Sequence, residues 1–131
     1  MLRKAGPDDV PEIRSLMESV PGFWQPHWSN STVARAITGH LAFVFEEHSQ
    51  ILGFICAHDL GFRAYLSELV VAPGSRNRGI GRALAHAVEQ ALSERGQTTL
   101  IADVWRDAIP FYRTLGWQPP EAALLRKTIM T

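Results

Sequence analysis

One segment constrains the fold more than any other: an apolar strand that leads through a glycine- and arginine-rich turn into an amphipathic helix. Residues 64–71 are rich in apolar side chains and predict the strand, and residues 72–79 form the turn. From Ile80 onward, apolar side chains recur three and four residues apart, which is one face of a helix that stops at Gly96. These positions are Ile80, Ala83, Leu84, Ala87, Val88, Ala91 and Leu92. The pattern predicts a sheet with a helix packed on it.

The rest of the chain alternates between strand and helix patterns. Asp8 is expected to cap the first helix and Asp107 the last one. Strands are expected at residues 2–4, 41–46, 51–58, 64–71, 98–104 and 123–129, and the other helices at 7–20, 31–38 and 108–115. The middle strands form an antiparallel meander, and the later elements follow a β-α-β-α-β order. This order predicts one mixed sheet with helices packed on it.

The composition excludes several classes of partner. The chain has 13 Lys and Arg against 13 Asp and Glu, so it has no bulk attraction for nucleic acid or an anionic membrane. No stretch reaches the roughly 18 apolar residues of a membrane helix, and the N-terminus lacks a signal-peptide core. The single cysteine, Cys56, is expected in the core and cannot form an internal disulfide. We therefore expect a soluble, cytoplasmic protein, and five histidines without ligand spacing predict no metal site.

The turn before the long helix has the chemistry of an anion-binding site. The first N–H groups of a helix lack internal partners, and the helix dipole is positive there. Gly79 and Gly81 permit positive φ and leave room for a close approach. Arg76, Arg78 and Arg82 add positive charge around the same turn. A phosphate or pyrophosphate group of a nucleotide-like cofactor is the expected ligand.

Two common phosphate-binding motifs do not fit this turn. A P-loop needs Lys followed by Ser or Thr after its final glycine, whereas Ile80 and Gly81 follow Gly79. A dinucleotide fingerprint needs a third small residue where Leu84 stands. It also turns almost at once, whereas seven residues separate Val71 from Gly79.

A third motif fits. The run Arg76-x-x-Gly79-x-Gly81, preceded by Val71-x-Pro73, resembles the acyl-CoA signature of the GNAT superfamily of N-acetyltransferases. Residues 108–117 resemble the later helix of this family, and the first strand and helix also match, so the resemblance covers nearly the whole chain. It implies an α/β (α+β) fold with a mixed, mostly antiparallel central sheet and helices on both faces, as a single domain over residues 1–131. It also implies an enzyme that moves an acetyl group from acetyl-CoA to a primary amine.

The resemblance also implies which residues bind acetyl-CoA. The strand before the turn is expected to splay from its neighbour, so that Leu69, Val70 and Val71 contact the pantetheine arm. The pyrophosphate is expected against Arg76, Asn77, Arg78, Gly79, Ile80, Gly81, Arg82 and Ala83. Arg76 either contacts the cofactor or holds the turn from behind. The short segment 104–107 lacks an Asn that many members have, and Trp105 or Arg106 is the alternative for that contact.

The acid and base of the reaction have several candidates. Tyr112 matches a family tyrosine that often faces the coenzyme sulfur, so it is expected to act as general acid or else only to pack the last helix. Glu68 and Asp103 are alternatives for the base, because a carboxylate on an apolar strand has a raised pKa or a partner. His58 and His27 are weaker candidates. A water chain, or an amine that arrives neutral, would need none of these side chains.

The acceptor is expected to be a small-molecule or peptide amine, with the small molecule favoured. Phe23, Trp24, His27 and Trp28 are expected to line its pocket or, alternatively, to cap the core of the sheet. Acetylation of a protein N-terminus or lysine, and a non-catalytic acyl-CoA-binding module, remain the alternatives. The protein is expected to be a monomer or a homodimer, with no nucleic-acid or membrane partner.

Overall fold

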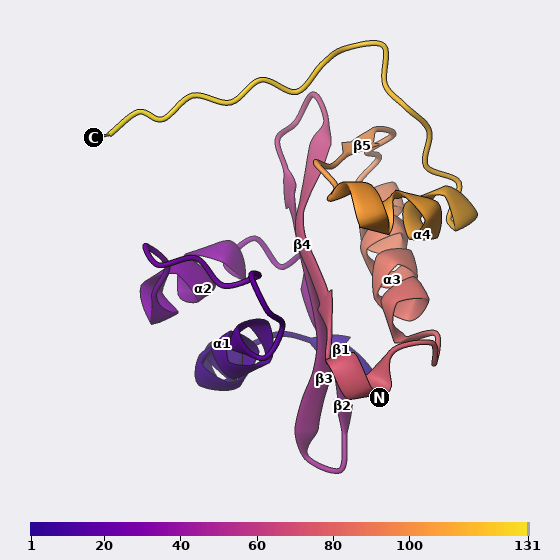
Figure 1. Ribbon diagram of the computed structural model, residues 1–131. Coiled ribbons are helices and arrows are strands. Elements are labelled where there is room, and N and C mark those ends of the chain that lie inside the picture. The colour runs from indigo at the N-terminus through magenta and orange to yellow at the C-terminus, as the bar shows by residue number, and fades with distance from the viewer. Residues whose placement is uncertain (131) are drawn as a thin grey trace.

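The computed structural model describes residues 1–130, and within them a five-stranded sheet separates two layers of helices (Figure 1). The strands lie in the order β1 (Leu2–Lys4), β2 (Ala42–Glu47), β3 (Gln50–Asp59), β4 (Ala64–Val71) and β5 (Leu100–Ile101). The first four strands are antiparallel neighbours, and β5 pairs parallel with β4. The mixed, mostly antiparallel sheet is therefore confirmed.

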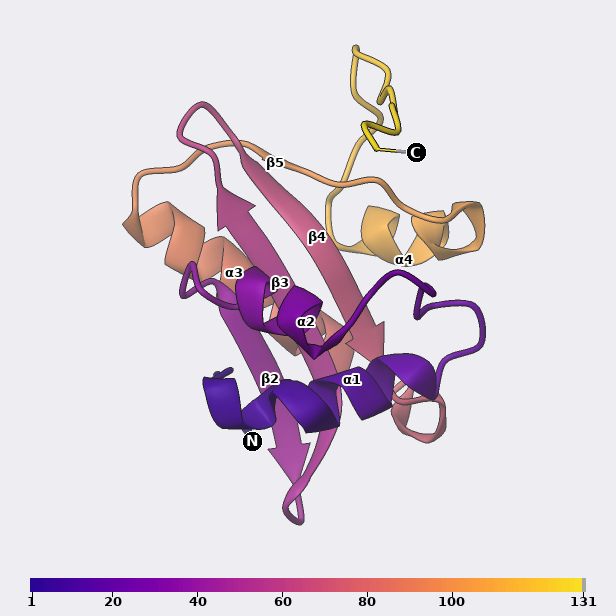
Figure 2. The same ribbon diagram turned by 90° about the vertical axis from the view of Figure 1, so that its left-hand side faces the viewer.

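Among the described residues, two α-helices lie on each face of the sheet (Figures 1 and 2). One layer holds α1 (Val10–Glu18), which follows a 3₁₀ turn at Pro7–Asp9, and α2 (Asn30–Ala36). The other layer holds α3 (Ile80–Glu94) and α4 (Ile109–Thr114). Helices on both faces confirm that part of the expected architecture. None of the described helices combines the length and apolar character needed to cross a membrane.

Helix α3 packs on the sheet through most of the apolar stripe that its sequence predicts, although Ala83 is exposed and Ala85, which was not expected in the stripe, is buried. Ile80, Leu84 and Val88 are fully or almost fully buried against the strands. The helix lies so close to β3 that a Cβ atom added at Gly53 would be 2.8 Å from Ile80 Cγ2 and 2.9 Å from Leu84 Cδ1. The missing side chain at Gly53 thus sets how near the first turn of α3 comes to the sheet.

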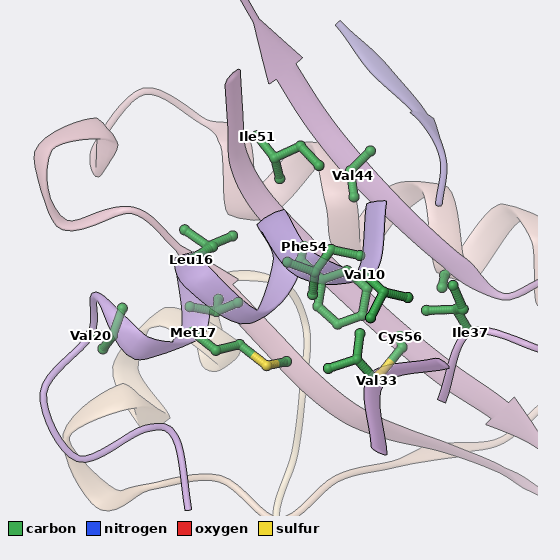
Figure 3. Close-up of a cluster of buried hydrophobic side chains, with 13 residues drawn as sticks. Val10, Leu16, Met17, Val20, Val33, Ile37, Val44, Ile51, Phe54 and Cys56 are labelled. Atoms are coloured by element: carbon green, nitrogen blue, oxygen red, sulfur yellow. The ribbon is translucent and has the colours of Figure 1, made fainter. Parts of the chain in front are cut away.

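A second core lies between the sheet and the layer of α1 and α2. Figure 3 shows Phe54 and Cys56 of β3 facing Val33 of α2 and Met17 of α1. Cys56 is buried, as expected, and its Sγ lies 3.1 Å from the Ser67 Oγ. Burial raises the pKa of this thiol to about 12, so it is not a reactive thiolate at neutral pH.

Two predicted strands are wrong in whole or in part. The strand expected at 98–104 is reduced to Leu100–Ile101, and no strand forms at 123–129. In that last segment Leu125 and Ile129 are 89% and 93% exposed, and Figure 1 shows the chain leading away from the sheet after α4. An apolar pattern forms a strand only where a neighbouring strand pairs with its backbone, and residues 123–129 have none within the described chain.

Both predicted helix caps are also wrong. Asp9, not Asp8, accepts a hydrogen bond from the Gly6 N–H at 2.8 Å. Asp9 is held in place by an ion pair with Arg3 of β1, also at 2.8 Å. Asp107 lies inside a 3₁₀ turn, Arg106–Ala108, and α4 begins after it without a side-chain cap. For the first helix, Asp9 rather than Asp8 is used because Arg3 of β1 pairs with it, and helix-capping rules do not include partners from a strand.

Candidate active site

Strands β4 and β5 pair over two residues and then separate. The paired residues are Ala64 with Leu100 and Tyr65 with Ile101. Beyond Tyr65, no described strand pairs with β4 on this side, although β4 continues to Val71. Every second N–H and C=O group of this stretch therefore points into the gap, where an extended ligand can bind to it. The gap has the form that the family resemblance implied for the pantetheine arm.

A β-bulge in β4 decides which side chains face which layer. Glu68 lies opposite Cys56, whereas Leu66 lies opposite Ala57, so Ser67 is the extra residue. Leu66 therefore packs toward α3, whereas Glu68, two residues later, lines a cavity on the side of α1 and α2. Bulges of this kind redirect side chains and are common beside active sites.

The turn after β4 has the backbone conformation of an anion-binding loop. It begins with a 3₁₀ turn at Pro73–Ser75 and passes through positive φ at Asn77 (65°) and Gly79 (81°). Gly79 is the N-cap residue of α3, and the first helical hydrogen bond runs from the Ala83 N–H to the Gly79 carbonyl. The preceding N–H groups of α3 have no partner within the helix and lie at the end of the gap.

Gly81 lies in the first turn of α3, next to α4. It is helical and does not adopt positive φ. A Cβ atom there would lie 3.2 Å from Phe111 Cζ of α4 and 3.7 Å from Val71 Cγ2. The absence of a side chain at Gly81 therefore leaves room for the Phe111 ring of α4 to pack against the start of α3.

The three arginines of the turn differ in their partners. The Arg78 guanidinium pairs with the Glu47 carboxylate at 2.7 Å, which ties the turn to the end of β2. This pair raises the pKa of Arg78 and lowers the pKa of Glu47. Arg76 and Arg82 are exposed, and neither side chain has a hydrogen-bond partner within residues 1–130. Arg76 thus does not hold the turn from behind in this structure.

The three predicted catalytic side chains lie within electrostatic range of one another. Burial, followed by the nearby Asp103 carboxylate, raises the pKa of Glu68 to about 7. Burial and the charges of Glu68 and Asp103 raise the pKa of Tyr112 to about 12. The Tyr112 ring also packs edge-on against Phe111 and Trp117, with both centroid distances at 5.5 Å. Tyr112, an acid that stays protonated at neutral pH, and Glu68, a base with a pKa near neutrality, therefore lie in one cluster.

Tyr65 belongs to the same cluster, although no motif pointed to it. Its hydroxyl donates a hydrogen bond to the Asp103 carboxylate across the mouth of the gap between β4 and β5. Burial and this carboxylate raise the pKa of Tyr65 well above its ordinary value. Tyr65 lies beside Ile101, which is two residues before Asp103. This placement could have pointed to Tyr65, but only once the pairing register of β4 and β5 was known.

The aromatic loop between α1 and α2 divides into two pairs. Trp24 and Trp28 pack edge-on, with their centroids 5.5 Å apart, and both line the cavity that Glu68 faces. Phe23 instead contacts Trp105, at a centroid distance of 5.9 Å, and His27 is exposed beside Trp28. Phe23 and Trp24 also pack against the core, which is one of the two roles expected for this loop.

A larger hollow of about 400 Å³ lies elsewhere, at the end of α3. Its walls include Glu89, Thr99 and Trp117, and none of the predicted site residues lines it. Within residues 1–130, no group of three His, Cys, Asp or Glu side chains is placed to hold a metal ion. The candidate site residues therefore lie along β4 and on both sides of it.

The family model of the acetyltransferase (GNAT) family matches residues 11–117, which include the turn, the gap and α4. The chain belongs to this family. The resemblance inferred from the two motifs is thereby confirmed. A search of curated protein sequences finds no match to this GNAT chain.

Solved structures with the same fold include proteins of different acceptors. The PaiA N-acetyltransferase of Thermoplasma acidophilum, in complex with coenzyme A, has a TM-score of 0.81 and 17% identity, over 94% of this chain and 92% of that one. The ribosomal-protein-S18-alanine N-acetyltransferase of Escherichia coli has a TM-score of 0.78 and 25% identity, over 88% and 76% of the two chains. An aminoglycoside acetyltransferase from an uncultured soil sample has a TM-score of 0.75 and 18% identity, over 100% and 96%.

Proposed function

We propose that this GNAT protein is an N-acetyltransferase that moves the acetyl group of acetyl-CoA to a primary amine. The observation that carries the proposal is the continuity of three features along β4: the half-buried Glu68, the gap beside β5, and the anion-binding turn at the start of α3. One end suits proton transfer, and the other suits a pyrophosphate. The gap between them suits an extended chain.

The residues along β4 and α3 fit acetyl-CoA. Backbone groups of Leu69, Val70 and Val71 would bind the pantetheine arm, since no described strand pairs with them on that side. The turn from Arg76 to Ala83 would hold the pyrophosphate through free N–H groups and the side chains of Arg76 and Arg82. Arg78 contributes by fixing the turn to Glu47. Acetyl-CoA supplies an activated acetyl group as a thioester.

We assign the proton transfers to Glu68 and Tyr112. An amine reaches the site mainly as an ammonium ion, and the Glu68 carboxylate removes its proton so that the nitrogen can attack. The nitrogen becomes bonded to the acetyl carbon as the thioester C–S bond breaks, and the Tyr112 hydroxyl holds a proton for the leaving sulfur. A base performs best when its pKa lies near the working pH, and the pKa of Glu68 is about 7. Asp103 acts through its charge, which helps to raise the pKa of Glu68.

The acceptor in this proposal is a small molecule that enters from the side of Trp24 and Trp28. The small cavity beside Glu68 supports this choice. Acetylation of a protein N-terminus is the second candidate, because the E. coli ribosomal-protein acetyltransferase shares 25% identity with this chain. A location in the cytoplasm and a monomeric or homodimeric state stay predictions.

Two matched glycines test the coenzyme site. Gly79 and Gly96 both adopt φ near +80° (81° and 80°), and an added Cβ atom at either would meet no other atom within 4 Å. Replacing either by Ala should cost about 1–2 kcal/mol of stability, because an L-residue is strained in this conformation. Only Gly79→Ala should also weaken acetyl-CoA binding, measured by titration calorimetry. Equal affinities in the two variants, or the absence of acetyl-CoA binding by the native protein, would reject the site.

A further inference from the structure

The cavity beside Glu68 has an apolar wall and a single charge. It is a partly open hollow of about 150 Å³ between α1, α2, β3 and β4. Its lining includes Trp24 and Trp28, Val33 and Ala36 of α2, and Phe54 of β3. Among the described residues that line it, Glu68 is the one that carries a charge.

Within residues 1–130 the Glu68 carboxylate lacks a hydrogen-bond partner, whereas the two hydroxyl groups of the wall are hydrogen-bonded. The Ser67 hydroxyl pairs with the Cys56 thiol, and the Thr32 hydroxyl accepts the Ser29 N–H at 3.0 Å. Within residues 1–130, no side chain or backbone group forms a hydrogen bond with the carboxylate of Glu68. A half-buried carboxylate without a partner is costly in an isolated protein, and a bound cation would remove that cost.

We propose that this cavity is the acceptor subsite and that it selects a compact primary amine whose apolar body is about the size of one six-membered ring. The inference rests on the proposed function and adds the substrate class. An apolar cavity of about 150 Å³ takes up a molecule the size of benzene. The ammonium group of such an amine would lie against Glu68, which faces the cavity, and the ring would lie between the tryptophans and α2.

The tryptophan wall is packed against neighbouring side chains. The Arg14 guanidinium lies 4.7 Å from the centre of the Trp24 ring and also donates to the Asn30 Oδ1 at 3.2 Å. Trp28 packs edge-on against Trp24. One face of Trp24 is thus already covered by a cation, and the remaining surface of the pair is free to contact an apolar body.

The same wall disfavours acceptors with more than one polar group. A polyamine or an aminoglycoside would bring a second ammonium group into a cavity where Glu68 is the sole counter-charge among the described residues. A peptide would bring several amide groups against a wall that is mostly apolar, and amide groups buried without partners are costly. The predicted order of reactivity is therefore benzylamine above spermidine and above a peptide that starts with alanine.

Two substitutions on α2 test the cavity directly. Ala36 lines it, whereas Ala34 is exposed on the same helix. Ala36→Leu should fill the cavity and weaken benzylamine binding at least tenfold in calorimetry without acetyl-CoA, with a similar loss in kcat/KM. Acetyl-CoA affinity should not change. Ala34→Leu carries the same change in side chain and should leave both affinities unchanged.

A second variant keeps the size of the cavity and removes its charge. Glu68→Gln should weaken benzylamine at least tenfold while it leaves the binding of neutral benzyl alcohol unchanged. This outcome would support the proposal even if Ala36→Leu did not fold. An equal effect on the two ligands would overturn the proposal.

The proposal would also be overturned if the native protein bound acetyl-CoA and acetylated spermidine or the peptide better than benzylamine, or if Ala36→Leu and Ala34→Leu behaved alike. Failure of acetyl-CoA binding would instead reject the proposed function. Because benzylamine binding is measured without acetyl-CoA, these two failures are distinguishable.

Discussion

Replacing Glu68 by Gln should make the protein more stable at alkaline pH, and the structure gives the size of the effect. The side chain is half-buried on β4, where burial and the Asp103 charge raise its pKa from 4.5 to about 7. The native state therefore binds this proton more tightly than the unfolded state does. The stability that this proton contributes is complete below pH 4.5 and is lost as the pH rises through 7, since the carboxylate is then ionised in both states.

The difference between the two pKa values corresponds to at most about 3 kcal/mol, and partial solvation of the carboxylate reduces this to about 1–3 kcal/mol. Glutamine has nearly the same shape and carries no charge. At pH 8 the Glu68→Gln variant should therefore be more stable than the native protein by about 1–3 kcal/mol, whereas at pH 4.5 most of the difference should vanish. Urea unfolding, followed by circular dichroism at both pH values, measures how the stability difference between variant and native protein changes with pH.

Glu47→Gln is the matched control because its pH dependence has the opposite sign. The pair with Arg78 lowers the pKa of Glu47, so its carboxylate stabilises the native state at high pH and loses that effect as the pH falls. Its amide variant should be the less stable protein at pH 8. If Glu68→Gln showed the same sign as Glu47→Gln, or no dependence on pH, the carboxylate would not be desolvated and the argument for Glu68 as a base would fail.

Three further results follow from the packing and the acid–base cluster. Gly53→Ala should cost about 1–3 kcal/mol in urea unfolding, because the added methyl displaces Ile80 at the start of α3; unchanged stability would show that the contact relaxes freely. Tyr112→Phe should lower kcat by about 10²–10⁴-fold with the same acetyl-CoA affinity, and native turnover with chemistry rate-limiting would leave Tyr112 as a packing residue. The kcat/KM profile should lose activity below about pH 7 as Glu68 becomes protonated. In Asp103→Asn, this loss of activity should begin at a lower pH. If the loss of activity at low pH disappeared instead, Asp103 would be the base.

Local sequence determined the elements whose stability depends on their own residues. β4 was predicted at its observed bounds, because its apolar residues pair with β3 along their whole length. The stripe of α3 is buried as its periodicity predicts except at Ala83, because residues three and four positions apart lie on the same face of a helix. Gly79 adopts the positive φ that only glycine takes without strain. The order of these three elements also carried the family motif, which is why the fold and the family were readable from the chain.

Tertiary structure decided every feature that depends on two segments meeting. The bulge at Ser67 turns Glu68 toward α2, and no local rule predicts which residue of β4 remains unpaired. Gly53 and Gly81 have ordinary conformations, and they matter because α3 and α4 come close to them. The pKa of Glu68 is raised by burial that the neighbouring layer provides. Residues 123–129 have a strand pattern but no strand beside them, since backbone hydrogen bonds in a sheet need a partner that the segment itself cannot supply.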